Sequence, residues 1–94
     1  MGCRLHTPHF ILLLAANSVD RSKLGLTVSR KIGNAVMRNR VKRQVREFFR
    51  HQQKNFTVPV DFSVVAKLGA ASLSLAETFA ELQQALEVKG HLDG

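Results

Sequence analysis

Several residue types that often form binding or catalytic sites are scarce in this chain of 94 residues. Tryptophan and tyrosine are absent, and Cys3 is the single cysteine. One cysteine cannot form an internal disulfide and supplies no cluster of metal ligands, which fits a reducing, cytoplasmic setting. Acids are also few, seven against 14 lysines and arginines, so the formal net charge is +7. The length predicts a single domain, residues 1–94, with room for one core.

Candidate catalytic groups are equally sparse. A metal-dependent nuclease needs converging carboxylates, but outside the C-terminal segment the acids are Asp20, Glu47 and Asp61, with no D-x-D or D-x-E pair. The sequence has no phosphate-binding glycine loop, nucleophile elbow or zinc-ligand spacing. The apolar run Phe10–Ala16 is too short to span a bilayer as a helix. We therefore expect no catalytic residue, no metal or other cofactor held by the protein itself, and no membrane partner.

Positive charge is concentrated in the middle of the chain. Residues 21–54 hold 11 basic residues and one acid, whereas residues 68–94 hold four acids and one base. The stretch from residue 30 to 50 reads R-K-I-G-N-A-V-M-R-N-R-V-K-R-Q-V-R-E-F-F-R. Such a field speeds encounter with nucleic acid and gives salt-sensitive affinity that does not depend on base sequence. A polyanion site is therefore predicted in this part of the molecule.

The same stretch has the apolar period of a helix, which we predict over residues 35–52 with Asn34 as its cap. At about 100° per residue, one side carries Met37, Val41, Val45 and Phe48. The opposite side is mostly basic, and Arg38 and Arg40 flank the boundary. A solvated helix usually interleaves acids with bases, but here the acid is Glu47 alone. We predict a helix with one face docked and the other positive.

Other segments predict an α+β fold, a small mixed sheet packed with helices in a two-layer sandwich. Strands are expected at 9–16, 24–30 and 60–67, after a coil over 1–8, and the last two strands can lie parallel because a helix joins them. The first is expected to be covered on both faces, since it is apolar throughout. A last helix over 74–87 begins with a capping box, Ser74 and Glu77. It would face the sheet with Leu75, Phe79, Leu82 and Leu86, and water with Glu81, Gln84 and Glu87.

Arginine dominates the basic segment, and its planar fork grips phosphate with two hydrogen bonds and stacks on bases. Contacts of this kind suit recognition of RNA by shape and by single-stranded segments. The polar residues Thr27 and Ser29, continuing to Lys31, are expected to form the floor of a groove beside the helix. The predicted RNA-binding residues are Arg30, Lys31, Arg38, Asn39, Arg40, Lys42, Arg43, Arg46 and Arg50.

The run S-R-K-I-G-N-A-V-M-R-N-R-V-K-R-Q-V-R-E closely resembles the protein subunit of bacterial ribonuclease P. The resemblance extends to R-L-H-T-P-H-F-I-L-L as the first strand, L-G-L-T-V-S as the next and V-D-F-S-V-V-A-K as the strand after the helix, so it covers roughly residues 4–87. The triplet Arg38, Asn39 and Arg40 after G-N-A-V is specific, because a generic basic helix has no reason to reproduce that order.

This resemblance implies a small basic protein that binds a catalytic RNA and helps it remove the 5′ leader from precursor tRNA. The chemistry would belong to Mg²⁺ held by the RNA, and no further protein partner is implied. Arg38, Asn39, Arg40 and the neighbouring basic side chains would face the RNA subunit. Arg30, Lys31 and the open sheet face around His9, Thr27 and Ser29 would line a cleft for the leader. The family fold also implies a left-handed crossover around the basic helix, a ribosomal-protein-S5-domain-2-like arrangement.

One departure is the short lead-in before the first strand, where family members usually carry an additional basic helix. Without that cover, the apolar strand is expected to lower stability or to support weak self-association. Two other functions stay open on the residues alone. One is a general RNA-binding or ribosomal-type protein without a role in tRNA processing, and the other is a self-sufficient metal-dependent nuclease.

Overall fold

The computed structural model describes residues 2–16, 23–52 and 60–88, to which the following account applies. These residues form one four-stranded sheet and two α-helices, with two short 3-10 helices between them. The elements in chain order are β1 (Gly2–His6), β2 (Phe10–Ala16), β3 (Lys23–Thr27), η1 (Arg30–Ile32), α1 (Ala35–Gln52), β4 (Val60–Ala66), η3 (Ala70–Ser72) and α2 (Leu75–Val88).

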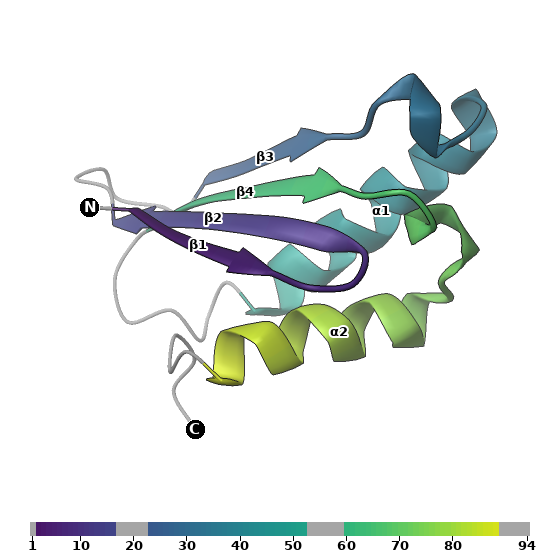
Figure 1. The fold of residues 1–94 in the computed structure, drawn as a ribbon. Coiled ribbons are helices and arrows are strands. Elements are labelled where there is room, and N and C mark those ends of the chain that lie inside the picture. Colours follow the sequence, from purple (N-terminus) through teal and green to yellow (C-terminus); the bar gives the residue numbers. More distant parts are fainter. Residues whose placement is uncertain (1, 17–22, 53–59, 89–94) are drawn as a thin grey trace.

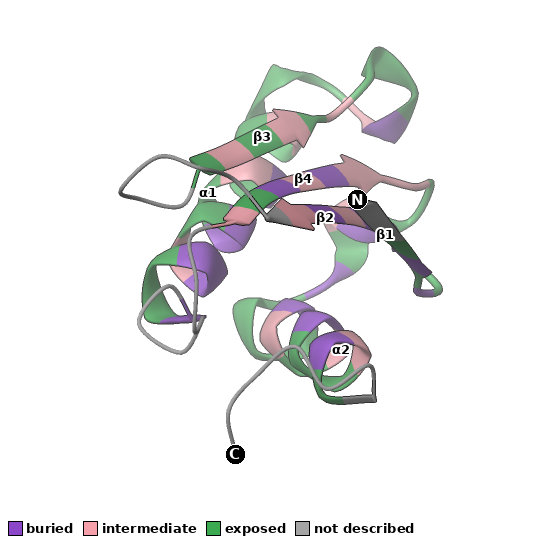
Figure 2. Ribbon diagram, turned by 90° about the vertical axis from the view of Figure 1, so that its left-hand side faces the viewer, coloured by how far each residue is buried: buried purple, intermediate pink, exposed green. Residues whose placement is uncertain are grey.

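The sheet has the strand order β1-β2-β4-β3. Strand β2 pairs antiparallel with β1 and β4, whereas β3 and β4 are parallel and are joined through α1, as the sequence predicts. Both helices pack on the same face of the sheet, and the path β3–α1–β4 winds in the left-handed sense (Figures 1 and 2). The predicted α+β fold with a small mixed sheet is confirmed.

The N-terminal residues correct the predicted coil over 1–8. Residues 2–6 form an edge strand, and the backbone N–H of Thr7 donates to the carbonyl of Phe10 at 2.8 Å to close a tight turn into β2. The side chain of Leu5 is buried while those of Arg4 and His6 are exposed, the alternation of a strand with one covered face. The segment likened to one first strand is therefore a hairpin.

The second predicted strand, 24–30, is also too long. Strand β3 ends at Thr27, and Arg30 begins the 3-10 turn η1. The N–H of Ile32 donates to the carbonyl of Ser29 at 3.1 Å, and Ile32 is buried. The strand ends before residue 30 because this turn places the Ile32 side chain in the core. The same turn sets the point from which α1 starts.

The core lies between the sheet and the helices. From α1 it takes Val41, Val45 and Phe48, each at most 1% exposed, which confirms the predicted docking of these three residues. The Phe48 ring meets Phe79 of α2 edge to face at 5.5 Å between ring centres. The other buried apolar side chains come chiefly from the inner sheet face and from α2: Leu5, Phe10, Leu12, Leu14, Phe62, Val64, Leu82 and Leu86.

The opposite face of the sheet is not covered by either helix (Figure 2). Its central side chains, Ile11 and Leu13 of β2 and Val65 of β4, are half-buried. Strand β2 is therefore covered on one face, not on both as its apolar run predicts. A continuous apolar run does not distinguish the two cases, because partly exposed aliphatic residues are common on protein surfaces. Weak self-association through this face remains a prediction.

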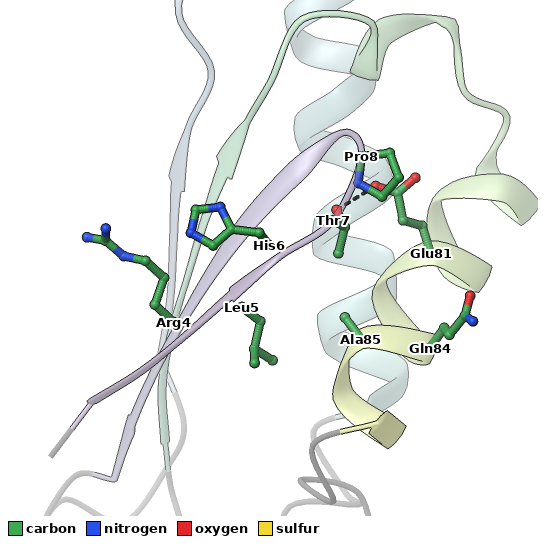
Figure 3. A pocket seen from close by; sticks show the side chains of 8 residues that line it. All are labelled: Arg4, Leu5, His6, Thr7, Pro8, Glu81, Gln84 and Ala85. Atoms are coloured by element: carbon green, nitrogen blue, oxygen red, sulfur yellow. Dashed lines mark hydrogen bonds between the residues drawn. The ribbon is translucent and has the colours of Figure 1, made fainter.

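A cluster of hydrogen bonds fastens the β1–β2 turn to α2. One carboxylate oxygen of Glu81 accepts from the Thr7 hydroxyl at 2.5 Å and from the His9 backbone N–H at 2.7 Å, and the other lies 2.8 Å from His9 Nδ1. The Lys67 ammonium donates to the Thr7 carbonyl at 2.6 Å. Glu81 thus faces this turn instead of open water, and it borders a cavity of about 550 Å³ between β1 and α2 (Figure 3).

This cluster makes the free energy of unfolding depend on pH. Burial opposes ionisation of Glu81, but the hydrogen bonds from Thr7 and His9 outweigh it, so the pKa of the Glu81 carboxyl lies below its ordinary value of 4.5. Its contribution is therefore complete above pH 4.5 and is lost as the pH falls through the lower folded-state pKa.

We predict that Glu81→Gln lowers the free energy of unfolding by about 2 kcal/mol at pH 7, because it removes hydrogen bonds to a charged acceptor. The variant should also lose part of the acid sensitivity, measured by urea unfolding between pH 7 and pH 3. Glu87→Gln, an exposed position on the same helix, is the matched control. Equal stability and equal pH dependence of the Glu81→Gln variant and the unaltered protein would contradict the assignment.

Candidate nucleic-acid interface

The start of α1 is fixed by a cap and a glycine. The Asn34 side-chain oxygen accepts a hydrogen bond from the backbone N–H of Met37 at 2.9 Å, which confirms the predicted cap. Gly33 before it has φ +155°, a conformation that L side chains rarely adopt. A Cβ built at Gly33 would lie 2.6 Å from the Met37 sulfur and 3.0 Å from its Cβ. The direction of α1 therefore depends on a residue without a side chain.

The helix occupies Ala35–Gln52, the range that the sequence predicts, and its outward side is basic. Exposed side chains at three- and four-residue spacing run along it (Asn39, Arg40, Arg43, Arg46 and Arg50), with Arg38 and Lys42 half-buried at one flank. Met37 is an exception to the predicted docked side, because it is 45% exposed. It lies in the first turn of the helix.

The cations of α1 are largely unpaired with acids. Within the described ranges, Arg50 is the one basic side chain of α1 that forms an ion pair with a carboxylate, that of Glu47. The Nε of Arg38 is buried and has no hydrogen-bond partner among these residues. Arginines neutralised by the protein's own carboxylates would have little attraction left for a polyanion. The arrangement instead leaves a positive face directed outward.

The acids of α2 are engaged elsewhere. Glu77 accepts from the backbone N–H of Ser74 at 2.8 Å, and the Ser74 hydroxyl accepts from the N–H of Glu77 at 3.1 Å, so the predicted capping box is confirmed. The backbone hydrogen bond from Ser74, followed by the side-chain one, lowers the pKa of the Glu77 carboxyl. Glu81 holds the β1–β2 turn as described above. Neither carboxylate reaches the basic side of α1.

A polar joint that the sequence did not reveal connects α1 to α2. The Leu73 carbonyl accepts from the Gln44 amide and from an Arg40 guanidinium nitrogen, both at 3.3 Å. The Gln44 oxygen accepts from the buried Thr78 hydroxyl at 2.9 Å. Gln44 lies three residues after Val41, so both side chains are on the inner side of α1. That spacing is the one feature of the sequence that indicates burial of Gln44.

Residues predicted on the sheet fall in two places. Arg30 and Lys31 are exposed on η1, and Thr27 and Ser29 are exposed at the end of β3. His9 does not join them, because its ring faces Glu81 of α2 on the other side of the sheet. His6 takes that place instead: strand pairing aligns it with Ile11, Val65 and Thr27 in one row across the open face. Along β1, exposed His6 follows buried Leu5, and this alternation is the sequence pattern that could have placed His6 on the open face.

Two further searches concern the described parts of the chain. There, no group of three or more histidine, cysteine or acidic residues is arranged to hold a metal ion. No helix in the same ranges has the length and apolar character needed to cross a membrane.

The fold and the outward cations define a small α+β RNA-binding protein, and comparisons with known proteins specify it further. The family model described as Ribonuclease P matches residues 1–89. A ribonuclease P protein component of Geotalea uraniireducens is 48% identical over 84 residues, covering 89% of this chain and 74% of that relative.

Solved structures agree with this similarity. The RNase P protein of Staphylococcus aureus superposes with a TM-score of 0.86 at 28% identity, covering 98% of this chain and 84% of the other. The RNase P protein of Thermotoga maritima gives 0.80 at 29% identity, with coverage of 99% and 86%. The chain therefore belongs to the ribonuclease P protein family. As the protein subunit of ribonuclease P, it acts in tRNA processing in association with the RNA subunit.

The glycine that starts α1 provides a test of the interface. Gly33→Ala should lower the free energy of unfolding by about 2 kcal/mol, the cost of forcing a side chain into a backbone region reserved for glycine. Tilting of the first turn should also weaken RNA binding in a filter assay. Gly25→Ala is the control, because the added Cβ would meet a side-chain oxygen of Ser63 at 3.3 Å without an unusual φ. Equal effects of the two substitutions would contradict this role of Gly33.

Proposed function

We propose that the basic side of α1 is the surface that binds the RNA subunit of ribonuclease P. The observation that carries this proposal is the row of exposed guanidinium groups that no carboxylate of the described residues neutralises, apart from that of Arg50. A helix held by its apolar side presents these groups at fixed spacing, so they can match phosphates along a folded RNA. The proposed contacts are Arg38, Asn39, Arg40, Lys42, Arg43 and Arg46, with Arg50 contributing less because of its ion pair.

The 5′ leader of precursor tRNA is the proposed ligand of the open sheet face. Arg30 and Lys31 supply charge at one end of that face, next to the polar side chains of Thr27 and Ser29. His6 replaces His9 in this proposal because it lies in the same cross-strand row as Thr27. Half-buried Ile11 and Val65 between them offer apolar contact to unstacked bases, as single-stranded RNA requires.

Bond cleavage is proposed to belong to the RNA subunit and the Mg²⁺ ions that it holds, in the cytoplasm, with no reacting group from this chain. The support is the composition of the exposed surfaces, which offer cations and apolar side chains instead of converging carboxylates. The protein's role is then to neutralise phosphates and to hold the precursor, which lowers the Mg²⁺ concentration that the RNA needs. RNA-free protein should leave precursor tRNA intact.

The central test is cleavage of precursor tRNA by the RNA subunit at low Mg²⁺, with and without protein. We predict that the triple variant Arg38→Ala, Arg40→Ala, Arg43→Ala no longer stimulates cleavage. Each lost phosphate contact should reduce the slope of log affinity against log salt by about 0.7 to 0.9, so the three together by about 2.1 to 2.7. Arg50→Ala is the comparison, and its loss should be smaller than that of any one of the three arginines because the Arg50 charge is already paired with Glu47. Full stimulation by the triple variant would refute the proposal.

A second substitution tests the leader surface separately. Lys31→Glu should weaken binding of a precursor that carries a 5′ leader by about tenfold, because it replaces attraction by repulsion beside a phosphate chain. Binding of mature tRNA, which has no leader, should change much less, and this comparison serves as the control. Fluorescence titration of the assembled ribonucleoprotein measures both. Equal losses for the two RNAs would place Lys31 outside the leader path.

A further inference from the structure

A groove between the two helices combines charge with apolar surface. It is lined by Val36, Arg40, Arg43, Gln44 and Glu47 of α1 and by Leu75 at the start of α2, and its volume is about 350 Å³. We call it the α1–α2 groove. That volume is at the lower end of the range for small-ligand sites. The groove lies where the first residue of α2 comes against the outward side of α1, so it opens on the proposed RNA interface.

Two guanidinium groups supply the positive charge of the groove. Arg40 and Arg43 are separated by three residues, one turn of helix, so their side chains are neighbours on its surface. One nitrogen of Arg40 is engaged with the Leu73 carbonyl, which holds the side chain in place and leaves its other N–H groups available. Arg43 is exposed and has no carboxylate partner among the described residues. Two neighbouring guanidinium groups with free N–H donors are suited to binding a phosphate group.

The walls of the groove are apolar and unusually exposed. Val36 is 77% exposed and Leu75 46%, although the side chains of α1 and α2 that face the core are almost completely buried. Neither exposed side chain contributes much to folding, because burial is what makes an aliphatic group stabilising. Next to a phosphate site, these groups can cover the flat face of a base. Glu47, whose carboxylate is held by Arg50, lines the groove beyond Arg43, about three helical turns from Val36.

We propose that the α1–α2 groove binds one unstacked nucleotide of the RNA partner, with its phosphate on Arg40 and Arg43 and its base against Val36 and Leu75. This inference rests on the proposed function of α1 and adds a defined ligand to it. The combination of lining groups favours this occupant: the arginines call for an anion and the aliphatic walls for a flat apolar surface, and a nucleotide offers both, whereas an acidic peptide brings carboxylates without a base. Paired RNA would satisfy the arginines but keeps its base faces stacked and unavailable.

The first experiment uses methyl-labelled full-length protein and nucleoside 5′-monophosphates as probes, observed by NMR. Adenosine 5′-monophosphate at millimolar concentration should shift the methyl signals of Val36 and Leu75. The signals of Leu68, which is 69% exposed but does not line the groove, should stay in place. Ribose 5-phosphate, which has no base, should bind more weakly and shift them less. Equal shifts with ribose 5-phosphate, or with a short acidic peptide, would overturn the proposal.

The second experiment measures affinity for the RNA subunit. Leu75→Ser should weaken binding by about fivefold, through loss of roughly 40 Å² of apolar contact. Leu75→Phe should strengthen binding, because an aromatic ring stacks better on a base, and a folding defect could not produce this gain. Leu68→Ser is the matched control. Unchanged affinity in both Leu75 variants, while the triple arginine variant loses binding, would overturn the nucleotide site and leave the proposed function intact.

Discussion

Burial of one side of α1 against the sheet is the constraint on which the rest of this molecule depends. Val41, Val45 and Phe48 remove the inner side of the helix from water, and this burial fixes which side chains remain outside. Without that anchor, a segment with so many like charges would repel itself and stay unfolded. Apolar packing therefore holds the positive charges in one place and one orientation, which is what a binding surface for a folded RNA requires.

The distribution of acids completes this separation of roles. Glu77 closes the start of α2, and Glu81 ties the β1–β2 turn to the same helix, so these carboxylates serve the fold at a distance from the basic side of α1. Glu47 is the acid within the basic helix, and it neutralises Arg50 near the end of that helix. Apart from Arg40, which also donates to the Leu73 carbonyl, stability and RNA attraction thus draw on different charged residues.

The sequence predicted the basic helix best, because eighteen residues of continuous period, preceded by an asparagine cap, leave few alternatives. It missed β1, since five residues before a proline carry too little pattern to separate a strand from coil. The position of His9 and the direction of Glu81 depend on a contact between residues 72 apart in the chain, which no local pattern encodes. Buried Gln44 is similar, because its partners, the Leu73 carbonyl and the Thr78 hydroxyl, are 29 and 34 residues away in the chain.

Single-sided packing of the sheet was equally beyond local pattern. An apolar strand such as β2 looks the same whether helices cover it on one face or on two, and the placement of both helices on the same face decides the matter. Likeness to a known family supplied what the pattern could not, including the hand of the crossover. The residues themselves supplied the chemistry of the surface, since the phase of arginine and apolar positions can be counted directly.

The Leu73 carbonyl is shared by two donors from neighbouring turns of α1. Gln44 is buried and holds its bond from within the core, whereas Arg40 reaches the same oxygen from the solvent side. Gln44 therefore keeps this contact independently of Arg40, whose other N–H groups can bind a phosphate. The contact between the two helices is thus made by two donors, so binding of a ligand to Arg40 need not weaken the packing that positions α1.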